Sequence, residues 1–342
     1  MSASKVTSTE VARRAGVSQS AVSRVFTPGA SASKATIAKV RKAAEELGYR
    51  PNNLARAMVS GKSRIIGLVV AYLENQFYPI VLEKLSNALQ EQGYHILIFT
   101  APNSSDGVES VIQDLMDYQV DGIVAASVSL SSDLAERATQ AGIPVVLFNR
   151  GQDHSPFVEV TSDNIAGGRQ VANFLLAGGH QRIAHISGWQ GSSTGRERQH
   201  GFHAGLAAAG AASVATLDGM YSREVAMECA DRLLKEHDPD AIFVGNDHMA
   251  FAVIDHLRRQ GVEVGREVSV VGYDDVPMAA WDAYDLTTIR QPVNQMVEAT
   301  VSALMAHIDN PNAATPRRET IDGPLIVRGS ARKPEGWLDE GV

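Results

Sequence analysis

The feature that most constrains the fold is a long alternation of short apolar runs and amphipathic helical stretches from Arg64 onward. Unbroken apolar runs separated by helices are typical of parallel strands covered by helices on both faces. Residues 80–92, for example, place Val81, Leu85 and Leu89 on one helical stripe. The length fits two such α/β units, that is, two doubly wound parallel sheets. The predicted strands are 65–71, 95–100, 122–126, 145–149, 183–187, 241–245 and 268–273.

Ligands of open α/β sheets bind beyond the carboxyl ends of the strands, so the residues after each predicted strand are binding candidates. Asn and Asp offer donors and acceptors for hydroxyl groups, and Arg offers a planar fork of donors. Aromatic rings stack on the apolar face of a sugar or a base. The candidates are Tyr72 to Tyr78, Thr100 and Ala101, Ser127, Asn149 and Arg150, the loop from Gly188 to Arg198, Asn246 and Asp247, and Tyr273 to Asp275, with Phe77, Tyr78, Trp189 and Tyr221 as the aromatic rings.

Charge is distributed unevenly along the chain. Residues 1–64 hold twelve Lys or Arg and three acids, a net charge of +9, whereas the whole chain has a net charge of −8. The remainder therefore carries −17. A basic head on an acidic body is expected when one part of a protein meets phosphates and the other does not.

The basic head has the signals of a helix-turn-helix. Thr7 and Glu10 form a capping box that opens a short first helix, and Gly16 supplies a tight turn. Ser18 caps a second helix that extends to about Val25. A third helix extends from 33 to 47. Two short helices joined by a turn with Gly are typical of this DNA-binding motif.

The first residues of the second helix enter the major groove in a helix-turn-helix. Here they are Ser18, Gln19 and Ser20, with Arg24 one turn further along. Gln pairs with adenine through two hydrogen bonds, and Arg pairs with guanine in the same way. Ser can form a hydrogen bond with the edge of several different bases. These residues are predicted to contact DNA.

A third sequence feature follows the head. Pro51 presets a first helical turn, and the next residues could form two turns of helix that are too short to persist alone in water. The stretches AGVSQSAVSRVF, ELGYRPNNLARAM and SRIIGLVV resemble the lactose-repressor (LacI) family of bacterial regulators. The resemblance covers nearly the whole chain, and it implies a hinge helix that orders on operator DNA.

By this resemblance Met58 occupies the position of the apolar wedge that enters the minor groove, where the family usually has Leu. Met is more flexible, so a less sharp wedge is expected. The resemblance and the motif together predict the DNA-binding set Thr7, Ser8, Ser18, Gln19, Ser20, Ser23, Arg24, Asn52, Leu54, Ala55, Arg56 and Met58.

For the body, the resemblance implies two lobes like those of periplasmic sugar-binding proteins, with a cleft between them. The chain is expected to cross between the lobes near 160–163, 288–292 and 321–324. The predicted domains are a head (1–50), a hinge (51–62) and a body (63–342), with one lobe over 63–161 and 291–321 and the other over 162–290 and 322–342.

The resemblance also narrows the effector site. Arg198 matches the arginine that grips the effector, Asn246 and Asp247 match a polar pair at the cleft floor, and Asp274 matches a ligand-binding carboxylate. Asn149 is placed as a polar contact and Tyr221 as a stacking ring. The predicted set is Tyr72, Phe77, Tyr78, Ser127, Asn149, Arg196, Arg198, Tyr221, Asn246 and Asp274.

Some assignments stay open. Arg150, Asp163 and Asn164 also match the family, with a structural role as an equal alternative, and Arg196 is either a second cationic contact or a solvated loop residue. Several arginines would suit a sugar acid or a sugar phosphate, and a neutral sugar is the alternative. One recognition helix reads few bases, so a homodimer on a near-palindromic operator is expected.

Other functions have less support in the sequence. The pairs His180/His185 and His200/His203 lack a third metal ligand, and no nucleophile–base motif or cofactor signature is found. A transporter's periplasmic binding protein would need a signal peptide, and the N-terminus has no apolar run of that kind. An enzyme would rely on Asp274 and Asp275. The single cysteine fits the reducing cytoplasm, where the protein is expected. No cofactor, metal or membrane is expected as a partner.

Overall fold

The computed structural model describes residues 6–27, 30–50, 62–71, 73–100, 105–128, 132–310 and 315–337. The chain divides into two compact units, Met1–Ser63 and Arg64–Val342. Among the described residues, no helix has the length and apolarity to span a membrane.

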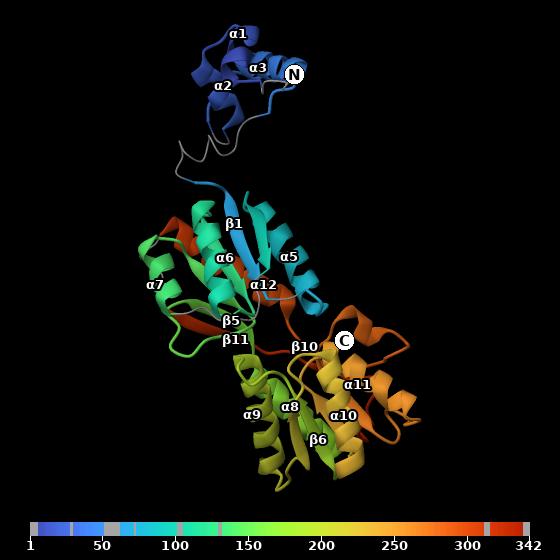
Figure 1. Ribbon diagram of the computed structural model, residues 1–342. Helices are drawn as coiled ribbons and strands as arrows, with labels where there is room; N and C mark the ends of the chain where they lie inside the picture. The colour runs from blue at the N-terminus through green and yellow to red at the C-terminus, as the bar shows by residue number, and fades with distance from the viewer. Residues whose placement is uncertain are drawn as a thin grey trace. The chain divides into compact units, whose positions relative to one another are not determined.

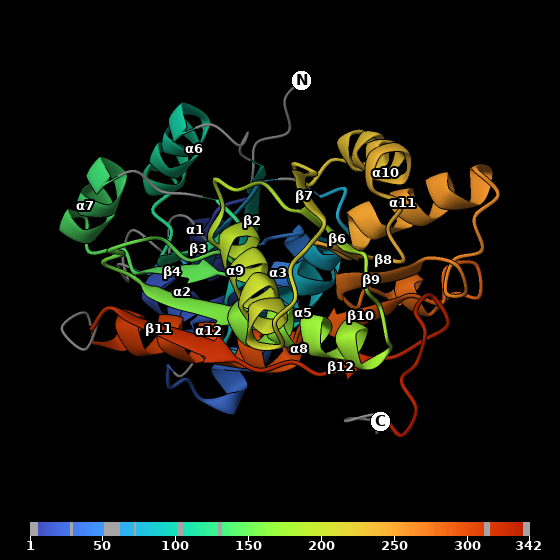
Figure 2. The ribbon, with the colours of Figure 1, turned by 90° about the horizontal axis from the view of Figure 1, so that it is seen from below.

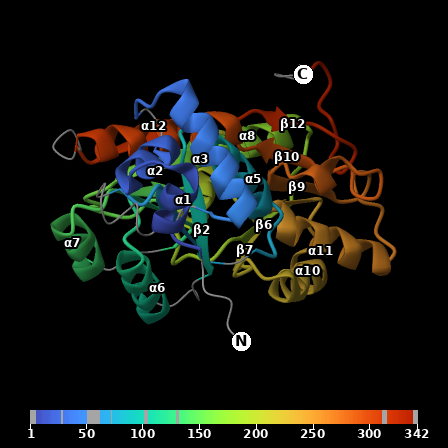
Figure 3. The same ribbon diagram turned by 90° about the horizontal axis from the view of Figure 1, so that it is seen from above.

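The first unit contains three packed helices, as the sequence predicted (Figure 3). Thr7 and Glu10 form the predicted capping box, and Gly16 ends the first helix with a left-handed φ of 66°. Ser18 and Ser33 cap the second and third helices through their side chains. The helices enclose a small core of Val11, Ala12, Val22, Val40, Ala43 and Ala44. Their bounds are α1 Ser8–Ala15, α2 Gln19–Phe26 and α3 Lys34–Leu47.

The second unit contains two sheets, and each has six strands in the described part of the chain (Figure 1). The first sheet has the order β11-β5-β4-β3-β1-β2 and is wholly parallel. With its helices it forms the first lobe. Its elements are β1 Ile65–Val70, α5 Phe77–Glu91, β2 His95–Thr100, α6 Ser105–Asp117, β3 Gly122–Ala126, α7 Ser132–Gln140, β4 Val145–Phe148, β5 Val158–Ser162, α12 Val293–Asp309 and β11 Arg317–Ile321.

The second sheet has the order β12-β10-β9-β8-β6-β7, and with its helices it forms the second lobe. Within this lobe α8 and α9 lie side by side (Figure 2). Its elements are α8 Asn164–Ala177, β6 Ile183–Ser187, α9 Ser193–Ala208, β7 Ala215–Asp218, α10 Arg223–His237, β8 Ala241–Val244, α11 Asp247–Arg259, β9 Ser269–Asp274, the short 3-10 helix η1 Pro277–Ala280, β10 Thr287–Arg290 and β12 Leu325–Ile326.

Alternating strand residues enter cores on opposite faces of each sheet, because successive side chains of a strand point to opposite sides. In β3, Val124 packs toward α5 and α12, whereas Ile123 packs toward α6. In β8, Phe243 packs toward α8 and α9, whereas Ile242 packs toward α10 and α11. Both sheets are therefore covered on both faces, which confirms the predicted fold class.

The sequence prediction differs from the structure in two respects. The strands β5, β7, β10, β11 and β12 were not predicted, because segments such as VEVTS, TTIR and RRETI lack a continuous apolar run. They become strands through pairing with neighbours distant in sequence, as when Arg317 aligns with Val158. In addition, β12 runs antiparallel to β10, so the second sheet is mixed rather than purely parallel.

Candidate functional site

Of the eleven described non-glycine residues with a positive φ, five are candidates from the sequence: Ser127, Asn149, Tyr221, Asp274 and Asp275, with φ values of 57°, 68°, 56°, 129° and 55°. Such conformations cost roughly 1–3 kcal/mol each and concentrate at binding sites. Ser127 and Asn149 directly follow β3 and β4, and Asp274 ends β9. Strained backbone therefore occurs at carboxyl ends of strands in both sheets, where the sequence predicted binding.

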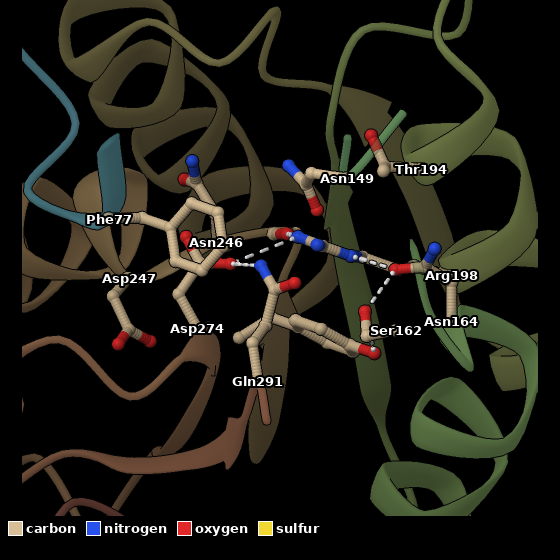
Figure 4. Close-up of polar contacts among 12 residues, drawn as sticks. Phe77, Asn149, Ser162, Asn164, Thr194, Arg198, Asn246, Asp247, Asp274 and Gln291 are labelled. Carbon is tan, nitrogen blue, oxygen red and sulfur yellow. Dashed lines mark hydrogen bonds and ion pairs between the residues drawn. The ribbon is translucent and has the colours of Figure 1, made fainter. Parts of the chain in front are cut away.

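Arg198, in the first half of α9, is the central cation of this region (Figure 4). Its side chain is 3% exposed, and its guanidinium lies 3.6 Å from an Asp274 carboxylate oxygen. Its Nε donates to the Asn164 Oδ1 at 2.9 Å, and its Nη1 donates to the Gly245 carbonyl at 2.7 Å. Arg198 is thus held by two elements of the second lobe besides its ion pair.

Asp274 is contacted from both lobes and from the crossing between them. Gln291, in the connection from β10 to α12, donates its Nε2 to Oδ1 of Asp274 at 2.7 Å. Asn75, just before α5 in the first lobe, donates its Nδ2 to Oδ2 at 3.3 Å. Burial raises the pKa of Asp274, while the Arg198 charge acts in the opposite direction. This carboxylate therefore joins the two lobes electrostatically.

Asp247 and Asn246 lie at the start of α11. Burial and the nearby Asp274 charge raise the pKa of Asp247 to about 8. Its oxygens accept hydrogen bonds from the Thr288 hydroxyl at 2.6 Å and from the Val276 backbone N–H at 3.0 Å. Asn246 caps the helix, because its Oδ1 accepts from the Met249 N–H at 3.0 Å. Asp247 therefore holds Thr288 and the backbone at Val276, and Asn246 stabilises the first turn of α11.

Three predicted residues of the first lobe form one buried cluster. The Tyr78 hydroxyl donates a short hydrogen bond to the Ser127 hydroxyl. The Asn149 amide donates to Ser127 Oγ at 3.1 Å and to the Tyr78 oxygen at 3.3 Å. Burial raises the pKa of Tyr78, so its hydroxyl stays protonated and can donate. Phe77 stacks on Phe148, with ring centroids 6.5 Å apart.

The structure does not bring every predicted effector residue into this site. Arg196 is 43% exposed and pairs with Asp153 at 3.4 Å, away from the Arg198 network. Tyr221, in contrast, lies at the site: its hydroxyl is 2.9 Å from Thr194 Oγ1, and it acts electrostatically on Arg198 and Tyr78. Tyr72 lies outside the described residues, as do Asn52, Leu54, Ala55, Arg56 and Met58 of the predicted hinge contacts.

The predicted effector set leaves out Asn75, which was a candidate only as part of the range Tyr72 to Tyr78, and Gln291, although both bind Asp274. Gln291 lies inside the predicted crossing 288–292, and Asn75 lies in the segment after the first strand, so position was the available signal. Beside Asp274 the structure has a pocket of about 300 Å³, a volume suited to a small ligand. The pocket is lined by Phe77, Ile80, Lys84, Asp274, Asp275, Val276, Arg290, Gln291, Pro292, Val293, Asn294 and Gln295.

The predicted DNA-contacting residues of α2 share an exposed face. Ser18, Gln19, Ser20, Ser23 and Arg24 are all exposed. Outside α2, Thr7 is exposed and Ser8 is half-buried, and the Gln19 Nε2 donates to the Ser8 hydroxyl at 3.0 Å. This face is therefore available to a partner, with polar side chains at the start of a helix.

Residues that the metal and enzyme alternatives would use, such as His185 and Asp275, have structural roles in this fold. In the described part of the chain no group of three or more His, Cys, Asp or Glu could hold a metal ion. His185 stacks on Phe243 at 4.9 Å, and burial lowers its pKa to about 3. Asp275 is held by ion pairs to Arg290 at 2.6 Å and to Arg328 at 2.7 Å.

Comparisons with known proteins match both units. Residues 7–52 match the family of bacterial regulatory proteins of the lacI type, and residues 172–331 match a periplasmic binding protein-like domain. The transcriptional repressor PurR of Photobacterium profundum is 31% identical over 328 residues, which cover 94% of this chain and 98% of the relative.

Two solved structures are similar over nearly the whole chain. The lac repressor dimer bound to operator and the anti-inducer ONPF is 26% identical with a TM-score of 0.86, covering 96% of this chain and 99% of that one. The complex of the transcriptional regulator CelR with cellobiose is 30% identical with a TM-score of 0.71, covering 96% and 100%.

Proposed function

The chain belongs to the LacI family of bacterial regulatory proteins, and from this premise we propose that it represses transcription by binding operator DNA with an affinity that a small molecule controls. The small molecule is a sugar, a sugar acid or a sugar phosphate that binds between the two lobes of the second unit. The protein acts in the cytoplasm as a homodimer on a near-palindromic site.

The contacts of Asp274 carry this proposal. Its carboxylate interacts with Arg198 in the second lobe, with Asn75 in the first lobe and with Gln291 in the connection between them. A ligand that competes for any of these donors changes how strongly the lobes are held together. Effectors act through such differences in affinity between two states. By linkage, the effector's effect on DNA affinity equals the effect of DNA on effector affinity.

DNA recognition is assigned to the exposed face of α2. Gln19 and Arg24 can each form bidentate hydrogen bonds with a base, and Ser18, Ser20 and Ser23 can bind base edges or phosphates. Thr7 and Ser8, at the start of α1, are assigned to phosphate contacts. Asn52, Leu54, Ala55, Arg56 and Met58 complete the proposed DNA contacts. The effector contacts are assigned to Tyr72, Phe77, Tyr78, Ser127, Asn149, Arg198, Tyr221, Asn246 and Asp274, with Arg196 at the margin.

The DNA part of the proposal is tested by selecting duplexes from a random library with the purified full chain. Selected sites should be near-palindromic, and Gln19→Ala should change the preferred bases. Arg266→Ala, an exposed change in the second lobe, is the control and should select the same sites. Selection of no sequence preference by the unaltered chain would contradict sequence-specific repression.

The effector part is tested by screening sugars, sugar acids and sugar phosphates for a ligand that changes affinity for the selected duplex. Asp274→Asn should leave DNA binding intact and remove the ligand response, because it removes the charge that pairs with Arg198. Asp153→Asn, an exposed carboxylate paired with Arg196, is the matched control. A full ligand response in Asp274→Asn would overturn the placement of the effector.

A further inference from the structure

Arg150 is a buried cation without a carboxylate partner. The residue is 4% exposed and directly follows Asn149 at the end of β4. Among the described residues no Asp or Glu lies within ion-pair distance of it, and its Nε is buried without a hydrogen-bond partner. Its guanidinium lies 5.6 Å from the Trp189 ring centroid, which gives a cation–π contact but no neutralising charge.

The other charges of the site are already compensated. Arg198 pairs with Asp274, and Arg196 pairs with Asp153. The buried carboxylate of Glu159, on β5, accepts from the Gln152 N–H at 2.8 Å and faces Arg318. Near neutral pH Asp247 adds little negative charge, because burial and Asp274 raise its pKa to about 8. Among the buried charged side chains that the structure describes around Arg198, Arg150 is therefore the cation that no carboxylate pairs with.

Two acceptors at the same site are also unpartnered. The Asn149 Oδ1 and the Gln291 Oε1 are buried without a hydrogen-bond partner, although each amide nitrogen donates within the site. Figure 4 shows both amides turned toward the space beside Arg198. Buried acceptors are costly to leave unpaired, so a ligand that supplies O–H donors is favoured here.

Resting on the proposed function, we propose that the effector is a polyhydroxylated anion whose carboxylate or phosphate binds Arg150. Its hydroxyl groups donate to the Asn149 and Gln291 amide oxygens. A desolvated guanidinium without a counterion is unfavourable, and an oxyanion both neutralises it and occupies its fork of donors. A neutral sugar could donate hydrogen bonds to the Asn149 and Gln291 amide oxygens, but it would leave the Arg150 charge buried and uncompensated.

The experiment follows thermal unfolding of the full chain while sodium phosphate or sodium acetate replaces sodium chloride at constant ionic strength. Each anion represents one of the two candidate groups. The unaltered chain should show a saturable rise in its unfolding midpoint with at least one of them. In Arg150→Met the apparent affinity should fall by about tenfold or more, as expected when one partner of a buried charge pair is removed.

Two variants complete the comparison. Arg266→Gln removes an exposed arginine that has no part in the proposed site and should behave like the unaltered chain, which also controls for nonspecific stabilisation by phosphate. Arg150→Lys keeps the charge without the fork and should retain part of the affinity. If Arg150→Met does not fold, Arg150→Gln takes its place.

Equal midpoint shifts in the unaltered chain and in the neutral Arg150 variant, with both anions, would overturn the proposal. The measurement involves no DNA, so it is separable from the proposed function. If an anion binds at Arg150 while no ligand alters operator affinity, the anion site stands and effector control fails.

Discussion

The guanidinium carbon of Arg198 lies 3.7 Å from the centroid of the Tyr273 ring, so the central cation of the site rests on an aromatic face. Tyr273 precedes Asp274 on β9, which makes one strand end supply both the ring beneath Arg198 and the carboxylate beside it. A cation over a buried ring gains about 2 kcal/mol or more when both are desolvated. Arg198 is thereby held before any ligand arrives.

Replacing Tyr273 tests this contact. Tyr273→Leu removes the ring face and should lower the free energy of unfolding by about 2 kcal/mol or more. Tyr273→Phe retains the face and loses two long contacts, at 3.5 Å to Ser162 and to the Asp163 carbonyl, so it should cost less than about 1 kcal/mol. Urea unfolding of both variants provides the measurement. Equal losses would show that the ring face contributes nothing beyond packing.

Gly168 allows α8 and α9 to approach closely. A Cβ at this position would lie 2.3 Å from the Arg198 carbonyl oxygen and 2.8 Å from the Phe202 nitrogen, both backbone atoms. Gly168→Ala should therefore push α9 away and lower the free energy of unfolding by about 1–3 kcal/mol. Because α9 carries Arg198, ligand affinity should fall as well. Arg169→Ala, exposed on the same helix, is the control in urea unfolding and should be nearly neutral.

Asp247 should make the stability of the second unit depend on pH. The pKa of its carboxyl is about 8 in the folded chain, against an ordinary value of 3.8, because of burial and the Asp274 charge. Between these values the folded state holds a proton that the unfolded chain has released, so the free energy of unfolding decreases as the pH rises. Above the folded pKa this contribution is lost. The slope for one proton is at most about 1.4 kcal/mol per pH unit.

Asp247→Asn removes this titration, so its unfolding free energy should change less with pH across the same window. Urea unfolding at several pH values between the two pKa values measures both slopes. Asp153→Asn, an exposed change, should keep the slope of the unaltered chain. Identical slopes for Asp247→Asn and the unaltered chain would show that Asp247 is ionised throughout.

The capping box of α1 should stabilise the head locally. The Thr7 N–H donates to the Glu10 carboxylate at 2.7 Å, and the Thr7 hydroxyl accepts from the Glu10 N–H at 3.4 Å. Thr7→Ala should cost about 1 kcal/mol of helix stability. Faster hydrogen exchange in α1 of the full chain measures it. Thr9→Ala, an exposed change inside the same helix, is the control and should leave the exchange unchanged or slower. If α1 were as protected in Thr7→Ala as in the unaltered chain, the role of the cap would be contradicted.

Local sequence signals were sufficient for the head and for much of the sheets. Thr7, Gly16 and Ser18 act on neighbours within a few residues, so their effect on helix starts and ends could be predicted without tertiary information. Apolar runs such as IIGLVV predict buried parallel strands for the same reason. Placement of Ser127, Asn149 and Asp274 at strand ends followed directly, because these residues come next in the chain.

The tertiary structure alone decided how these strand ends combine. Asn75 and Asp274 are 199 residues apart in the sequence, and Arg198 and Gly245 are 47 residues apart. Local sequence patterns do not predict contacts over such separations. Polar segments such as RRETI became strands only because a buried neighbour offered unpaired backbone groups. The head and the strand ends were thus set by short-range backbone preferences. The pairing of Arg198 with Asp274, and the unpaired state of Arg150, depend on which side chains the fold brings together in a water-poor space.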